Sequence, residues 1–190
     1  MFINQILKYP TLYRLYQKSV RKSYSEYDFF KFIFSQIKNE NIRMLDICCG
    51  DSYILNHVSD YIKDYMGIDY SDKYINYSKK NWEKFKFTQF DLRKNELTKE
   101  ILDFQPNLIF MNGAIHHLDD QINLNIYKFF KKLNCKYFIS VDPVKDNNKL
   151  MNKIMIRFDR GRFIRGKKEY QELFKDFNQF IVDDFYQMSF

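Results

Sequence analysis

Apolar positions in this chain follow two spacings, which alternate through most of its length. Short apolar or alternating segments, which are typical of buried strands, occupy residues 42–48, 64–69, 85–91, 107–113 and 136–143. Apolar residues three or four positions apart predict helices at residues 52–62, 71–82 and 121–133. Because strands and helices alternate, the sequence predicts an α/β fold with a doubly wound, mostly parallel sheet.

Helical spacing also precedes the first strand. It predicts short helices at residues 2–9, 11–22 and 25–38. We expect these helices to form a cap over residues 1–40, although the basic, partly amphipathic N-terminus also fits a transit peptide.

After the last strand of the core, a basic stretch leads to a predicted helix at 168–177 and a predicted strand at 179–188. A chain of 190 residues suits one domain. We therefore expect a single domain over 1–190, with a core at 41–145 and a separate segment at 146–190.

Composition narrows the class of protein. Hydrophobic residues make up 45% of the chain and aromatic residues 19%, so a packed core is expected. No apolar run approaches the ~20 residues of a membrane span. The net charge of +7 permits a nucleic-acid partner but does not favour one. Lysine is abundant together with Asn, Ile, Phe and Tyr, a bias that AT-rich coding alone would produce. Three cysteines and no signal peptide predict a cytoplasmic protein without structural disulfides.

Aspartates stand at or near the carboxyl ends of four predicted strands: Asp46, Asp69, Asp91 and Asp142. In parallel sheets, ligands bind outside these strand ends. An aspartate that caps the following helix explains one or two of the four. All four are harder to explain that way, because crowded carboxylates repel one another unless a cation or hydroxyl groups engage them.

The segment DICCGDS, residues 46–52, raises the question whether Cys48 and Cys49 form a redox pair, a metal site or part of a nucleotide loop. Asp69 follows Asp46 by 23 residues. An acid about 20 residues past a glycine-bearing first turn typically holds ribose hydroxyls. The spacing therefore favours a cofactor that contains ribose, and the lack of G-x-G-x-x-G disfavours a dinucleotide.

At these residues the chain resembles the class I S-adenosylmethionine-dependent methyltransferases, whose first motif is D/E-x-G-x-G-x-G. Only the middle glycine, Gly50, is kept here; Cys48 and Ser52 stand at the other two glycine positions. The segment NGAIHHLDD, residues 112–120, also resembles the family segment after strand four. The resemblance implies a Rossmann-like fold with S-adenosylmethionine as cofactor. It also implies a shortened C-terminal strand pair in this chain.

The resemblance assigns cofactor contacts by position. They are Asp46, Cys48, Cys49 and Gly50 in the loop, Asp69 at the ribose, Tyr70 against adenine, Asp91 and Leu92 at the adenine edge, and Asn112 near the methionine part. The N-terminal helices would fold over the cofactor, with Tyr13 and Gln17 as contacts. YPTLYRLYQ, DPV and DRGRFIR further resemble a small bacterial methyltransferase group, some of whose members occur with surface-glycan biosynthesis genes.

Two adjacent histidines follow strand four, where the methyl group should point. A neutral histidine suits removal of a hydroxyl proton near pH 7, so His116 or His117 is the candidate base, and Asp142 would orient it or bind the acceptor. The alternative is that one histidine only packs or caps a helix. A zinc site built from both histidines and both adjacent cysteines is disfavoured, since zinc ligands usually follow C-x2–4-C spacing. We predict no metal.

Arginines concentrate in one window. Four of the eight in the chain lie within nine residues: Arg157, Arg160, Arg162 and Arg165. Because lysine is preferred elsewhere, the window suggests planar, bidentate recognition of an anion. It lies in the 146–190 segment, where such folds place acceptor-recognition elements. The alternative is a solvated basic loop, or ion pairs with Asp159 and the acidic strand ends.

Three functions follow from these features. The first is an enzyme that O-methylates a small, anionic acceptor such as a sugar, glycan or lipid precursor. The second is an RNA methyltransferase, although residues 112–115 lack the Asn/Asp-Pro-Pro-aromatic motif of many N-methylating RNA enzymes. The third is a non-catalytic S-adenosylmethionine-binding subunit, suggested by the altered glycine motif.

Overall fold

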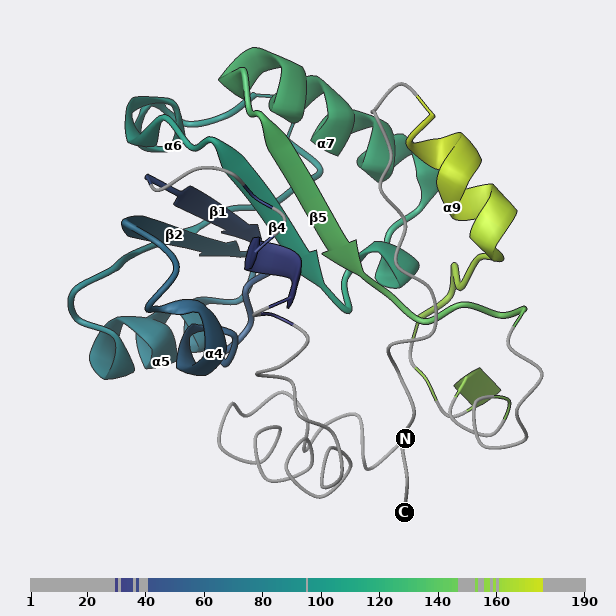
Figure 1. The fold of residues 1–190 in the computed structure, drawn as a ribbon, viewed down its shortest axis with the longest axis horizontal. Coiled ribbons are helices and arrows are strands. Elements are labelled where there is room, and N and C mark those ends of the chain that lie inside the picture. Colours follow the sequence, from purple (N-terminus) through teal and green to yellow (C-terminus); the bar gives the residue numbers. More distant parts are fainter. Residues whose placement is uncertain are drawn as a thin grey trace. The chain divides into compact units, whose positions relative to one another are not determined.

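The computed structural model describes residues 30, 32–35, 37, 41–94, 96–146, 153, 156–157, 159 and 161–175. Figure 1 shows the fold. Backbone contacts divide the chain into two compact units, and among the described residues the division falls between Asp91 and Leu92. We call the described part up to Asp91 the first unit and the described part from Leu92 the second unit. A single domain over 1–190 stays a prediction.

All five predicted strands are present, and their ends differ from the predicted ones by at most two residues. Their order in the sheet is β3-β2-β1-β4-β5, and the register of β1 with β2, β2 with β3, and β4 with β5 is parallel. The strands are β1 Arg43–Ile47, β2 Asp64–Asp69, β3 Lys86–Gln89, β4 Leu108–Asn112 and β5 Tyr137–Val141. The order and direction confirm the prediction of a doubly wound, parallel α/β fold.

The first unit pairs its three strands with α4 (Leu55–Val58) and α5 (Asp72–Asn81). Helix α5 packs on β2 and β3 through Ile75, which is buried. The helix predicted at 52–62 is confined to the four residues of α4, because turns occupy the residues on both sides.

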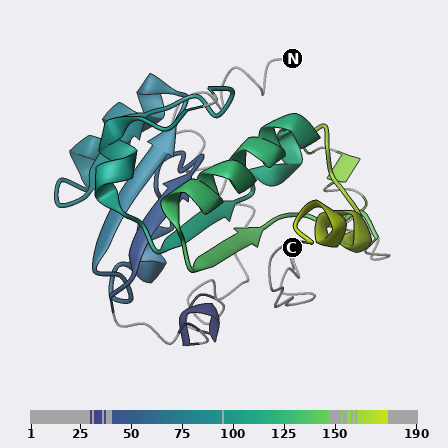
Figure 2. The same ribbon diagram turned by 90° about the horizontal axis from the view of Figure 1, so that it is seen from above.

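The second unit contains α6 (Lys99–Phe104), the 3-10 turn η1 (Ile115–His117), α7 (Asp120–Leu133) and α9 (Lys167–Leu173). The long helix α7 runs along β5 (Figure 2), where the rings of Phe130 and Phe138 lie 6.5 Å apart. Phe174, at the end of α9, lies 5.0 Å from the same Phe138 ring. One aromatic side chain of β5 therefore anchors both helices.

Helix α6 was not predicted. The sequence features that specify it are few. The side chain of Thr98 accepts a hydrogen bond from the backbone N–H of Ile101, and Ile101 and Phe104 are the two buried residues. A helix of six residues offers too few turns for a clear periodic pattern, so the cap was the more informative signal.

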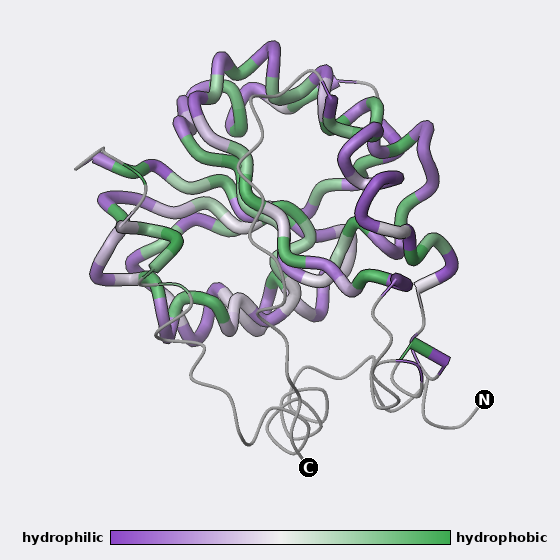
Figure 3. Tube along the Cα trace, turned by 45° about the vertical axis from the view of Figure 1, so that its right-hand side comes forward, coloured by the Kyte–Doolittle hydropathy of each residue, from purple (hydrophilic) through white to green (hydrophobic). Residues whose placement is uncertain are grey.

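Strands β1, β2 and β4 are largely buried, as expected for the inner strands of a parallel sheet, whereas the outer strands β3 and β5 are only partly buried. Figure 3 shows stretches of hydrophobic colouring interspersed with hydrophilic ones along the trace. In β4, Leu108, Ile109, Phe110 and Met111 are all fully buried. No described helix is long and apolar enough to cross a membrane.

Several predicted features fall on residues that the structure does not describe. Within the cap at 1–40, residues 30 and 32–35 are helical, and Tyr13 and Gln17 lie outside the described residues. The predicted strand at 179–188 and the shortened strand pair also lie outside them. These features stay predictions.

Candidate active site

The loop after β1 turns through three left-handed residues. Cys48, Gly50 and Ser52 have φ angles of +60°, +54° and +56°. Left-handed backbone suits glycine and costs other L-residues about 1–2 kcal/mol each. The loop therefore keeps the backbone conformation that a three-glycine motif would favour, although two of its three positions carry side chains.

Other parts of the first unit hold this loop in place. The N–H of Cys49 donates to the carbonyl of Ile68 at 3.1 Å, and the Ser78 hydroxyl lies 3.3 Å from the carbonyl oxygen of Gly50. Apart from Gly50 and its two chain neighbours, no described residue has an atom within 4 Å of the place that a Cβ on Gly50 would occupy. The backbone at Gly50 is thus supported from α5 and open on its other side.

Asp69, the last residue of β2, is tied to this loop. Its two carboxylate oxygens accept hydrogen bonds from the N–H of Gly50 at 3.0 Å and from the N–H of Ser71 at 2.8 Å. The side chain is 8% exposed, and burial raises its pKa despite these two donors. Each oxygen keeps a further lone pair, so the carboxylate can still accept from a ligand hydroxyl.

Asp46 lies inside β1 and is 3% exposed. The hydroxyl of Tyr65 donates to its carboxylate at 2.6 Å. Burial raises the pKa of Asp46 to about 8, and the negative charges of Asp69 and Asp51 act in the same direction. A hydroxyl partner and a raised pKa together remove much of the repulsion expected among the strand-end aspartates.

The Cys49 thiol is a packing group. Its sulfur would lie 2.9 Å from a Cβ at Gly67, so glycine is required where β2 passes this side chain. Burial, followed by the charges of Asp46 and Asp69, raises the pKa of the thiol well above its ordinary value. A protonated, buried thiol is neither a good nucleophile nor a metal ligand.

The remaining residues assigned to the cofactor differ in exposure. In the first unit, Tyr70 is 72% exposed and Asp91 is half-buried. In the second unit, Leu92 is buried and Asn112 is the half-buried last residue of β4. Their assignment to adenine and methionine stays a prediction.

In the second unit, His116 and Asp142 come together, as their positions after β4 and β5 predict. Nδ1 of His116 lies 2.7 Å from Oδ1 of Asp142, and the backbone N–H of His116 donates to the same oxygen at 3.2 Å. Both side chains are buried. The second oxygen of Asp142, Oδ2, is buried and has no hydrogen-bond partner among the described residues.

Asp159 lies on the other side of the same imidazole, with its Oδ1 3.3 Å from Nε2 of His116. Burial alone would lower the pKa of His116, but the hydrogen bonds and charges of Asp142 and Asp159 outweigh it and raise the pKa to about 9. His116 is therefore mostly protonated at neutral pH, with both ring nitrogens engaged by carboxylates.

His117 differs from its neighbour. Its side chain is exposed, and its ring centroid lies 4.1 Å from that of His116. Of the two candidate bases, His117 is the one that solvent reaches. The third histidine of the chain, His57 in α4, packs edge-on against Tyr53 at 5.1 Å and has no part in this cluster.

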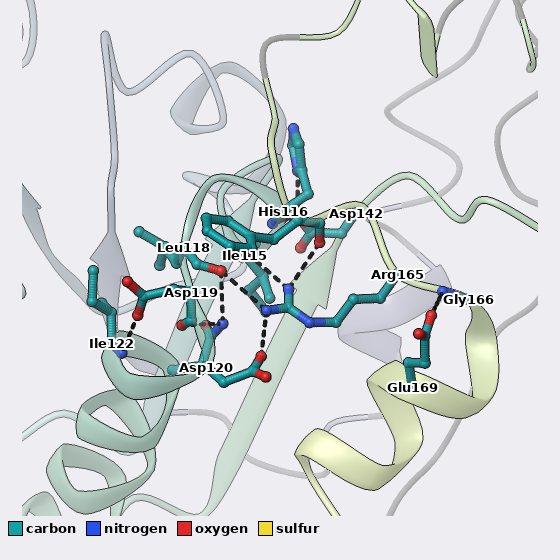
Figure 4. A network of polar contacts seen from close by, with 12 residues as sticks. Ile115, His116, Leu118, Asp119, Asp120, Ile122, Asp142, Arg165, Gly166 and Glu169 are labelled. Carbon is teal, nitrogen blue, oxygen red and sulfur yellow. Dashed lines mark hydrogen bonds and ion pairs between the residues drawn. The ribbon is translucent and has the colours of Figure 1, made fainter.

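Arg165 is buried rather than presented to solvent. Its guanidinium donates to the carbonyls of Phe163 at 2.9 Å and Leu118 at 3.1 Å, and it pairs with Asp120 at 2.6 Å (Figure 4). A weaker contact reaches the carbonyl of Ile115 at 3.4 Å. These contacts tie the 163–166 segment to η1 and to the start of α7.

The other arginines of the window have different positions. Arg157 and Arg162 are exposed, and Arg160 lies outside the described residues. The ion pair expected between this window and Asp159 does not form through Arg165, which pairs with Asp120 instead. Acceptor recognition therefore stays a prediction for Arg157, Arg160 and Arg162, and the contacts of Arg165 point to a structural role.

Sequence reasoning missed the way in which Asp159 and Gly161 meet His116. A Cβ on Gly161 would collide with the His116 ring and with its carbonyl oxygen, and the N–H of Phe163 donates to that carbonyl at 2.9 Å. More than 40 residues separate the two segments. The only available signal was a glycine between two arginines, Arg160 and Arg162.

A family model described as a methyltransferase domain matches residues 38–188. The chain belongs to this methyltransferase family. Membership of this family agrees with the expectation that S-adenosylmethionine is the cofactor. No curated protein matches the sequence.

Solved structures share the fold at low identity. YcgJ from Bacillus subtilis is 16% identical, with a TM-score of 0.54 over 77% of this chain and 65% of its own. A TehB-like SAM-dependent methyltransferase from Corynebacterium glutamicum is 14% identical, with a TM-score of 0.56 over 77% and 79%. A SAM-dependent methyltransferase from Clostridium acetobutylicum is 14% identical, with a TM-score of 0.51 over 70% and 57%. The chain thus spans less than two thirds of two of these proteins.

The first unit fits the cofactor of the methyltransferase. The left-handed loop leaves the Gly50 backbone approachable, and Asp69 stands at the end of β2 with lone pairs for hydroxyl groups. These are the features that a ribose-containing ligand requires.

The strain at Cys48 can be measured. We expect Cys48→Gly to raise the free energy of unfolding of the methyltransferase by about 1 kcal/mol, because glycine removes the left-handed penalty. Denaturant unfolding gives the value, and calorimetry with S-adenosylmethionine should show unchanged or tighter binding. Cys48→Ala is the matched control: it removes the sulfur but keeps the Cβ, so it should not stabilise. Stabilisation by the alanine variant alone would contradict the strain argument.

The buried and the exposed arginines of this window should differ in their contribution to the free energy of unfolding. We expect Arg165→Ala to lower the free energy of unfolding by about 3 kcal/mol, because it leaves buried carbonyls without donors. Arg162→Ala, in an exposed position of the same segment, should change stability by less than about 0.5 kcal/mol. Equal effects of the two substitutions in urea unfolding would show that the buried contacts of Arg165 are not stabilising.

Proposed function

We propose that the protein transfers the methyl group to a hydroxyl oxygen of a small, anionic acceptor, such as a sugar, glycan or lipid precursor. The observation that carries the proposal is the cluster of imidazoles and carboxylates after β4 and β5, above all the 2.7 Å contact between His116 and Asp142. A nitrogen acceptor that is already nucleophilic needs no such cluster, whereas a hydroxyl must lose a proton.

The residues of the cluster have different roles in this proposal. When bound, S-adenosylmethionine supplies a methyl group activated by a positively charged sulfur. The contribution of the protein is to align the acceptor and to receive its proton. His116 is held between two carboxylates and fixes the geometry of η1, and we assign the acceptor proton to the exposed His117.

An anionic acceptor is supported by Arg157 and Arg162, which are exposed in the second unit. Planar guanidinium groups bind carboxylates and phosphates through paired hydrogen bonds. The resemblance of DPV and DRGRFIR to a methyltransferase group linked with surface glycans supports a glycan-related acceptor, and a cytoplasmic location fits an acceptor of that kind.

The loop after β1 supports retained cofactor binding, which an enzyme requires and a cofactor-binding subunit without activity would share. The altered motif suggested that the loop had degenerated, yet Cys48 and Ser52 keep the left-handed backbone of the glycines they replace. A loop that had lost its ligand would have little reason to retain two strained residues.

The test combines calorimetry with a methyl-transfer assay. Purified protein should bind S-adenosylmethionine and convert it to S-adenosylhomocysteine in the presence of phosphorylated or carboxylated sugars. We expect His117→Ala to lower kcat by about 100-fold or more, with an unchanged Kd for the cofactor, because the affected group acts on the acceptor. Arg157→Ala with Arg162→Ala should raise the KM of the acceptor instead.

His57→Gln serves as the histidine control, since His57 lies in α4 and should leave kcat unchanged. Product analysis decides the atom that is methylated. A methylated nitrogen, or full turnover in His117→Ala, would overturn the proposed chemistry. Methylation of RNA but of no small acceptor would overturn the proposed substrate class.

A further inference from the structure

We propose that His116, His117 and Asp159 bind one divalent transition-metal ion. One ligand atom from each of the three residues can be chosen so that all of them lie within 4.8 Å of one another. Two imidazoles and one carboxylate form a donor set that suits Mn²⁺, Fe²⁺, Co²⁺ or Zn²⁺. It is the one group among the described residues with this spacing.

The side chain of Asp142 supports His116 as a ligand. A histidine that binds a metal commonly donates its other ring N–H to a carboxylate, which fixes the tautomer and orients the ring. Here Asp142 takes that position, 2.7 Å from Nδ1. The remaining nitrogen, Nε2, is directed to the side of Asp159, and a metal ion there would replace the proton that now joins the two.

The carboxylate of Asp159 is also held in position by a hydrogen bond. The N–H of Gly161 donates to Oδ1, the same oxygen that faces Nε2 of His116 at 3.3 Å. Since a Cβ on Gly161 would collide with the His116 ring, the glycine allows the backbone to bring this carboxylate close. The contact holds Asp159 near its position before any ion binds.

The cluster has the character of a reactive site rather than a closed structural one. His116 is buried, but His117 and Asp159 are exposed, so an ion held by the three would keep positions for external ligands. The buried Oδ2 of Asp142, which has no partner among the described residues, adds negative charge beside them. Ligand atoms around a bound ion stand roughly 3–3.5 Å apart, which requires only small side-chain movements.

This site deepens the proposed function and rests on it for the hydroxyl acceptor. With an ion bound, His117 acts as a metal ligand instead of receiving the acceptor proton. A metal ion would act as a Lewis acid at the acceptor oxygen and lower the pKa of its hydroxyl. The hydroxyl proton would leave to water or buffer. The oxygen would then form the new O–C bond while the electron pair of the broken S–C bond returns to sulfur.

Metal binding can be measured without any acceptor. Tag-free, chelator-treated full-length protein is titrated with Mn²⁺, Zn²⁺ and Co²⁺ by calorimetry, and the visible spectrum of bound Co²⁺ reports nitrogen ligands. We expect one ion per chain. His117→Ala and Asp159→Asn, both at exposed positions that should fold normally, are each expected to weaken binding by at least about 10-fold, and Asp142→Asn by about 10–100-fold.

His57→Gln is the matched control and should bind the ion like the unmodified protein. Absence of stoichiometric binding, or equal binding by His117→Ala and the control, would overturn the metal site. Transfer that persists in chelator but depends on His117 would overturn this inference and leave the proposed function intact. One bound ion with these ligand effects, but no methylated hydroxyl, would support the site and overturn the proposed function.

Discussion

The second unit depends on one buried contact, the hydrogen bond between the His116 imidazole and the Asp142 carboxylate. It connects the turn after β4 to the end of β5, and it directs the other ring nitrogen, Nε2, toward Asp159. A buried carboxylate without such a partner would be costly, and so would a buried imidazolium. Each group therefore offsets the cost of burying the other. Together they fix the turn that carries the exposed His117.

The two units share one kind of hydrogen bond at their strand ends, from a loop N–H to an aspartate carboxylate. In the first, Asp69 at the end of β2 accepts the backbone N–H of Gly50; in the second, Asp142 after β5 accepts the backbone N–H of His116. In each case a carboxylate from one strand fixes the loop that follows another strand. Two of the four strand-end aspartates, Asp69 and Asp142, are thus loop anchors. Repulsion involving Asp46, Asp69 and Asp142 is reduced because a tyrosine hydroxyl, backbone donors and an imidazole engage them.

Much of the sheet could be predicted because buried parallel strands leave continuous apolar runs, as at residues 107–113. The pairing of Asp142 with a histidine was also within reach, since both follow neighbouring strand ends. The partners of Arg165 and the approach of Gly161 were not, because they depend on the path of a long, irregular segment. A local pattern carries no information on which carbonyl a guanidinium will meet about 50 residues away.

The close approach of Gly161 to His116 also has a consequence for the history of the family. A relative that keeps the histidine must keep glycine at the other position, because any side chain there would strike the ring. A relative that has lost the histidine is released from that restriction. The two positions should therefore vary together among homologous sequences, and a coordinated loss of both would mark the lineages in which this cluster is no longer maintained.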